Sequence, residues 1–126
     1  PVDPAVIARA VAGLRDQLWR NLAREVPDLA RNGHAERVLP NTLNVRFPGV
    51  SGNALLERAP EIAASTGSAC HDGHDKASAV ILALGVPASD AVGAVRLTLG
   101  RHTTAAEIEA AAATLVSAWK SLAAPA

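Results

Sequence analysis

The feature that most constrains the fold of this chain is a repeated switch in the spacing of its apolar residues. In the first segment they recur every three or four positions, which predicts one face of an amphipathic helix. From Thr42 they alternate instead with polar residues, which predicts a half-buried strand. The residues that carry the two patterns are Ile7, Val11, Leu14, Leu18 and Leu22, then Leu43, Val45 and Phe47. Both spacings return later, so helices and strands must alternate along the chain.

Four helices are expected from their start and stop signals. The first begins at Pro4 behind an Asp3 cap and ends near Val26. A short second helix follows Ser51 and stops before Pro60. The third begins behind Asp75 and ends at Gly85, and the fourth begins at a capping box formed by Thr104 and Glu107. The apolar residues expected on the inner side of this last helix are Ile108, Leu115, Trp119 and Leu122.

Three strands are expected between these helices, at 42–47, 62–64 and 95–99, and residues 28–36 are expected to be a loop. Helices and short strands in this order predict the α/β class. The expected architecture is a two-layer α/β sandwich with a small, mainly antiparallel three-stranded sheet and four helices. A chain of 126 residues is long enough for one domain of this kind, residues 1–126.

Composition excludes several classes of protein. The 12 basic and 12 acidic side chains balance, which excludes a strongly basic nucleic-acid binder. A hydrophobic fraction of 49% provides a core. The sequence has neither an apolar run long enough to span a membrane nor the pattern of a signal peptide. The single cysteine cannot form an intramolecular disulfide, so a cytoplasmic location is expected.

The segment from Ser65 to Asp75 consists of small and polar residues and holds that cysteine, Cys70. Gly67 permits unusual backbone angles, and Ser68 and Ala69 are small, so the thiol could lie on an accessible loop. His71 could then lower the pKa of the thiol or shuttle a proton. Composition alone leaves a small cysteine buried in a turn equally open.

The same segment offers potential metal ligands, namely Cys70, His71, Asp72, His74 and Asp75. It lacks a second cysteine and a paired CxxC knuckle, and adjacent ligands point in divergent directions. We therefore expect no metal site, and keep a site at Cys70, His71 and His74 as an alternative.

Arg96 lies on the expected third strand between Val95 and Leu97, so its side chain should face the opposite layer from theirs. A guanidinium fixed on a strand suits bidentate binding of a carboxylate. The residues by themselves favour a plainer interpretation, an exposed arginine or a partner of Glu61. The only lysines, Lys76 and Lys120, have no surroundings typical of a Schiff-base lysine and are expected to be solvated.

Three motifs in order resemble the C-terminal domain of the cysteine desulfurases, pyridoxal-phosphate (PLP) enzymes of the class V aminotransferase group. They are Leu39-Pro40-Asn41-Thr42-Leu43-Asn44-Val45, Ser65-Thr66-Gly67-Ser68-Ala69-Cys70, and the run 96–104, RLTLGRHTT. The resemblance extends over nearly the whole chain. The Ala-Cys-His sequence at 69–71 is also similar to selenocysteine lyase, a close relative.

The resemblance implies a larger enzyme than this chain. In the family a large domain holds PLP through a lysine, and the small C-terminal domain closes over the site. Residues 1–126 would then be that small domain alone, without the PLP-binding domain and without cofactor-binding residues of its own. The fragment is expected to bind no PLP and to be inactive by itself.

The resemblance also implies residue roles. Arg96 would bind the substrate α-carboxylate, and Cys70 would take sulfur (or selenium) from L-cysteine (or selenocysteine), leaving a persulfide and alanine. Thr66, Gly67, Ser68, Ala69 and His71 would form the catalytic loop that lets Cys70 move. The implied partners are a sulfur-acceptor protein, such as an iron–sulfur scaffold, and a second subunit of the full-length homodimer.

Two departures from the family concern the partner and the substrate. Lys76-Ala77-Ser78-Ala79-Val80 stands where the family often has Glu-Pro-Ser-His-Val, and the segment after Cys70 is more charged than usual. The alternatives are a selenocysteine lyase domain and a non-catalytic binding module on the same fold.

Overall fold

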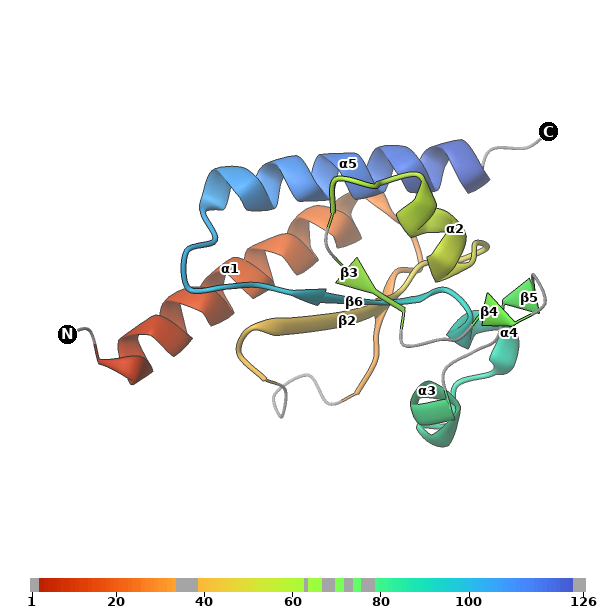
Figure 1. The fold of residues 1–126 in the computed structure, drawn as a ribbon, viewed down its shortest axis with the longest axis horizontal. Helices are drawn as coiled ribbons and strands as arrows, with labels where there is room; N and C mark the ends of the chain where they lie inside the picture. The colour runs from red at the N-terminus through yellow and green to blue at the C-terminus, as the bar shows by residue number, and fades with distance from the viewer. Residues whose placement is uncertain are drawn as a thin grey trace.

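Two long helices lie together on one face of a small antiparallel sheet (Figure 1). They are α1 (Pro4–Glu25) and α5 (Ala105–Ala123) in a computed structural model that describes residues 3–33, 39–62, 64–66, 70–71, 74–75 and 79–123. Three short helices complete the described set: α2 (Gly52–Glu57), α3 (Ala79–Ala83) and α4 (Ala88–Ala91). The two-layer α/β class expected from the sequence is confirmed.

The main sheet has the strand order β1-β2-β6-β3, and all its pairs are antiparallel. The strands are β1 (Ala30–Arg31), β2 (Thr42–Arg46), β6 (Ala94–Thr98) and β3 (Ala64–Ser65). A separate two-stranded sheet pairs β4 (Cys70–His71) with β5 (His74–Asp75). The two longest strands, β2 and β6, form the centre of the main sheet.

The described sheet therefore has four strands where three were expected, and the described helices number five where four were expected. The missed strand β1 has two residues and lies in a segment expected to be a loop. It pairs with the edge of β2, and so short a strand carries no alternating pattern of its own. The strand expected at 62–64 is β3 at Ala64–Ser65, and the missed helix α4 has four residues.

The predicted helix boundaries agree closely with the structure where it describes them. Asp3 accepts a hydrogen bond from the Ala5 amide at 2.9 Å, with Pro4 as the first helical residue. Thr104 and Glu107 form the expected capping box. Gly85 has the positive φ of +87° that ends α3. Asp75, the expected cap of α3, pairs in β5, and residues 76–78 lie outside the described ranges.

The core fills the space between the helix layer and the sheet. Buried residues of α1 and α5 pack against the inward-facing positions of β2 and β6, and Phe47, Leu22, Leu55 and Leu115 are the largest fully buried side chains. Within the described ranges, every helix is too short or too polar to cross a membrane.

Two backbone contacts fix α2 and the end of β2 against the segment that leads into β6. The Gly52 amide donates to the Val92 carbonyl at 2.8 Å, and a Cβ at Gly52 would lie 2.5 Å from the Ala94 oxygen. The Phe47 amide donates to the Gly93 carbonyl at 2.9 Å, and a Cβ at Gly93 would lie 2.2 Å from the Phe47 oxygen. Both positions therefore need glycine because backbone approaches backbone there.

Candidate active site

The candidate site lies on the face of the sheet that α1 and α5 leave open. Leu43, Val45, Val95 and Leu97 point into the core, so the alternate residues of β2 and β6 point away from it. Asn44 on β2 and Ser65 on β3 both stand directly opposite Arg96 in the strand register. Directly paired residues share a face. The strands β2, β6 and β3 lie side by side (Figure 1), so Asn44, Arg96 and Ser65 form a row across them.

Arg96 is exposed at the centre of this row, while Val95 and Leu97 beside it are buried. This is the orientation that the alternating pattern predicts. Arg96, Thr98, Ala64 and Ser65 line a shallow hollow of about 290 Å³. Within the part of the chain that the structure describes, the guanidinium has no hydrogen-bond or ion-pair partner, and Glu61 is not paired with it. It is free to bind an anion from outside.

Two further polar residues, Asn32 and Arg46, join the row at the β1 side, and neither was singled out from the sequence. Asn32, only 7% exposed, donates from Nδ2 to Asn44 Oδ1 at 2.8 Å, and its backbone amide donates to the Asn44 carbonyl at 2.9 Å. Arg46 donates from Nη1 to Asn32 Oδ1. Asn32 follows a two-residue strand that the sequence does not reveal, so only the register brings the three residues together.

The start of the predicted catalytic loop is anchored. Thr66 donates from Oγ1 to Asn53 Oδ1 on α2 at 2.8 Å, and its Cγ2 lies within 3.0 Å of the position that a Gly52 Cβ would occupy. Because α2 is itself fixed against β6, Thr66 is held close to the strand that carries Arg96. Gly67, Ser68 and Ala69, the next residues of the predicted loop, lie outside the described residues.

Cys70 and His71 form β4, which differs from the expected continuous loop at 65–75. Cys70 stands opposite Asp75 and His71 opposite His74 in the register of this hairpin. Asp72-Gly73 between the strands is a dipeptide typical of two-residue hairpin turns, a signal that could have predicted the hairpin. Cys70 follows Ser65 by five positions, so their Cα atoms lie within about 18 Å of each other even in a fully extended chain.

The described residues do not fit a PLP site. Lys120 is 59% exposed on α5 and lies 3.7 Å from Glu25, as expected for a solvated lysine and not for one in a Schiff base. Lys76 falls outside the described ranges. Among the residues that the structure describes, no three His, Cys, Asp or Glu side chains gather into a possible metal site. The alternative metal site at Cys70, His71 and His74 depends on side chains outside that description.

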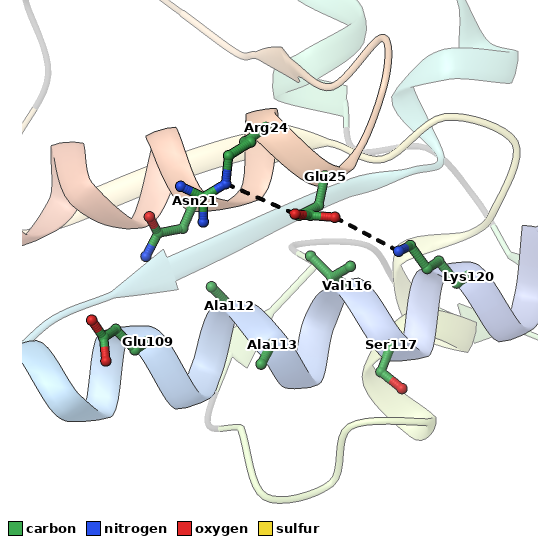
Figure 2. A pocket seen from close by; sticks show the side chains of 9 residues that line it. All are labelled: Asn21, Arg24, Glu25, Glu109, Ala112, Ala113, Val116, Ser117 and Lys120. Carbon is green, nitrogen blue, oxygen red and sulfur yellow. Dashed lines mark ion pairs between the residues drawn. The ribbon is translucent and has the colours of Figure 1, made fainter.

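A larger cavity than the hollow at Arg96 belongs to the other layer. It lies between α1 and α5, has a volume of about 740 Å³, and has Glu25 between Arg24 at 3.8 Å and Lys120 at 3.7 Å (Figure 2). Three of its charged groups, Arg24, Glu25 and Lys120, pair with one another, and the sheet separates the cavity from Arg96. This cavity therefore contributes nothing to the candidate site.

Arg31 on β1 also points to the helix layer. Its guanidinium lies 4.5 Å from the Trp19 ring centroid and 3.9 Å from Asp16. Burial lowers the pKa of Arg31, and the nearby Asp16 carboxylate opposes that shift. The cation–π contact joins β1 to α1, so Arg31 has a structural role.

No protein-family model matches the chain. Individual curated proteins are similar to it in sequence. A cysteine desulfurase of Trichormus azollae is 40% identical over 98 residues, which cover 76% of this chain and 24% of the relative. The cysteine desulfurase IscS of Klebsiella pneumoniae strain 342 is 40% identical over 97 residues, covering 77% of this chain and 24% of the relative. The chain thus spans about a quarter of the length of these relatives.

Solved structures show the same fold. A NifS-like protein aligns with a TM-score of 0.70 at 24% identity, over 90% of this chain and 28% of that protein. A NifS-like protein from Rickettsia africae ESF-5 aligns with a TM-score of 0.69 at 21% identity, over 91% of this chain and 28% of that protein. By sequence, the chain is therefore related to the cysteine desulfurases and matches their C-terminal region, and it has the fold of the NifS-like proteins.

Proposed function

We propose that this chain is the sulfur-accepting small domain of a PLP-dependent cysteine desulfurase. In this proposal Arg96 binds the α-carboxylate of L-cysteine and Cys70 receives its sulfur. The observation that carries the proposal is the free guanidinium of Arg96 on the open sheet face, with Ser65 opposite it only five residues before Cys70. The identity of 40% to cysteine desulfurases over three quarters of the chain supports the same assignment.

The proposed sulfur transfer accounts for every bond, electron pair and proton. The Cys70 thiolate attacks Sγ of L-cysteine, so an S–S bond forms and the Cβ–Sγ bond breaks. The electron pair of the broken bond stays with the substrate carbon skeleton, which takes up a proton and leaves as alanine. The thiol of Cys70 becomes a persulfide, whose outer sulfur passes to a nucleophile on an acceptor protein.

PLP, held by a part of a longer protein outside these 126 residues, would supply the electron withdrawal that makes the Cβ–Sγ bond labile. Of this chain's own residues, Arg96 would bind the substrate carboxylate and Cys70 would accept the sulfur. Arg96 offers two parallel N–H donors to a carboxylate, and its strand β6 is one of the two inner strands of the main sheet. Substrate position is then set by the rigid part of the fold, and sulfur transfer by the segment that follows Thr66.

Further parts of the proposal concern the setting of the enzyme. A thiol that cycles through a persulfide needs a reducing compartment, which favours the cytoplasm. The acceptor is proposed to be a protein of iron–sulfur cluster assembly or another sulfur-transfer pathway. The full-length enzyme is proposed to be a homodimer.

The experiment uses the full-length, PLP-loaded protein with L-cysteine, and measures alanine formation together with the mass of the peptide that contains Cys70. We expect that peptide to gain one sulfur atom, and the gain to be reversed by a thiol reductant. C70S should abolish both the mass gain and multiple turnovers. Normal alanine release by C70S would overturn the role of Cys70. The same assay with L-selenocysteine separates a selenocysteine lyase, which would prefer that substrate.

A further inference from the structure

We infer that Asn44 is a second carboxylate-binding residue, which donates a hydrogen bond to the same substrate carboxylate as Arg96. The inference rests on the proposed function and extends it to a residue that neither composition nor motif assigned. It begins from the register of the neighbouring strands β2 and β6 (Figure 1), in which Asn44 stands directly opposite Arg96. Side chains paired in this way on one face of a sheet have Cβ atoms about 5 Å apart, close enough to bind the two oxygens of one carboxylate.

The amide of Asn44 is oriented by its neighbour on the other side. Asn32 lies on the β1 side of β2, and it donates from Nδ2 to Asn44 Oδ1 at 2.8 Å. Asn32 cannot easily turn away, because it is buried, its backbone amide donates to the Asn44 carbonyl, and its own Oδ1 accepts from Arg46. The oxygen of the Asn44 amide is therefore occupied, and Nδ2 is left for the side on which Arg96 lies.

Asn44 and Arg96 thus bring N–H donors together without an acceptor between them. In the described ranges, neither Asn44 Nδ2 nor the Arg96 guanidinium donates to any protein group. Grouped donors with no protein acceptor suit a small anion, and a carboxylate can accept from both residues at once. Arg96 would supply charge, and Asn44 would fix the angle at which the carboxylate lies on the sheet.

The substitution N44D, read together with the response of the wild-type Asn44 amide, tests this role. Aspartate has the same shape and can still accept from Asn32, but it replaces the Nδ2 donor by a negative oxygen. If Asn44 served only to accept from Asn32, N44D would keep the fold, and the Asn44 Nδ2–H₂ group of the unsubstituted chain would not respond to a carboxylate. If Asn44 donates to a carboxylate, N44D repels the ligand and also pairs with Arg96. T42V is the matched control, because Thr42 lies two residues away on the same face of β2.

The first measurement is an NMR titration of the 126-residue chain with sodium acetate, against sodium chloride at equal ionic strength. We expect the Arg96 Nε–H and Asn44 Nδ2–H₂ signals to shift along one saturation curve with acetate only. N44D should remove the Arg96 shift, and T42V should keep it. A shift of Arg96 without Asn44 would overturn the inference alone. Absence of both shifts would contradict the inference and the role of Arg96 together.

The second measurement is the KM for L-cysteine in the full-length, PLP-loaded protein. N44D should raise KM by about tenfold or more, as expected when a hydrogen bond to a charged group is lost. Its thermal midpoint and that of T42V should stay near the wild-type value. If R96A raises KM and N44D leaves it unchanged, Asn44 does not bind the substrate although the proposed function stands.

Discussion

At the scale of single residues, the fork geometry of Arg96 decides how it can act. A lysine at this position would keep the charge but lose the two parallel N–H donors. In the full-length, PLP-loaded protein we expect R96K to raise the KM for L-cysteine about tenfold, and R96A to raise it further, since a charge-assisted bidentate contact is lost. Steady-state kinetics of alanine release measures both.

R9A is the matched control for these variants, because Arg9 is an exposed arginine on α1, in the helix layer behind the sheet. It removes the same charge from the chain and should leave KM unchanged. An equal rise of KM in R9A would mean that net charge, and not the position of Arg96, sets the affinity for substrate.

Asn32 is expected to matter for stability because it is a buried amide with hydrogen bonds on both sides. N32A would leave Asn44 Oδ1 without its partner and would remove one of the two acceptors of the Arg46 guanidinium. The free energy of unfolding should fall by about 1–3 kcal/mol, as measured by denaturant titration. Asn21, which lines the cavity between α1 and α5 (Figure 2), provides the control. N21A should change stability by less than about 0.5 kcal/mol, and a similar loss in both variants would contradict the special role of Asn32.

At the scale of elements, two glycines make opposite predictions for the same substitution. A Cβ at Gly93 would lie 2.2 Å from the Phe47 backbone oxygen, so G93A should destabilise the fold by about 3 kcal/mol. Gly13 lies within α1 with nothing within 4 Å of its Cβ position, so G13A should stabilise it by about 0.5–1 kcal/mol. Thermal and denaturant unfolding measure both changes. Equal effects of the two substitutions would show that the contact of Gly93 with Phe47 is not formed.

The elements also show what the sequence could and could not predict. The long helices and the strands β2 and β6 were predictable because their apolar periods run over several residues and their caps are explicit, as at Asp3 and Thr104. Strand β1 was not, because two residues cannot show a period and the partner β2 defines them. The row of Asn44, Arg96 and Ser65 could not be predicted either, because it depends on which strands pair and in which register. The sequence predicted which way Arg96 points, and only the register could say what stands beside it.

At the scale of the whole molecule, the two faces of the sheet have different tasks. The helix layer and the inner face of the sheet form the core, while the outer face carries polar side chains. An antiparallel sheet can be stable with one face open in this way. This division places the candidate binding residues where they can be reached from outside without disturbing the core.

The same division predicts how the chain behaves without any further segment. Its described residues offer Arg96 and Asn44 for a carboxylate but no lysine suited to PLP, since Lys120 is exposed and paired with Glu25. The 126-residue chain mixed with PLP and L-cysteine should therefore release no alanine above the rate of PLP and L-cysteine in buffer, and the C70S chain should behave identically. Alanine release that rises in proportion to the concentration of the wild-type chain, over many turnovers, would contradict this expectation and show that the 126 residues contain a complete active site.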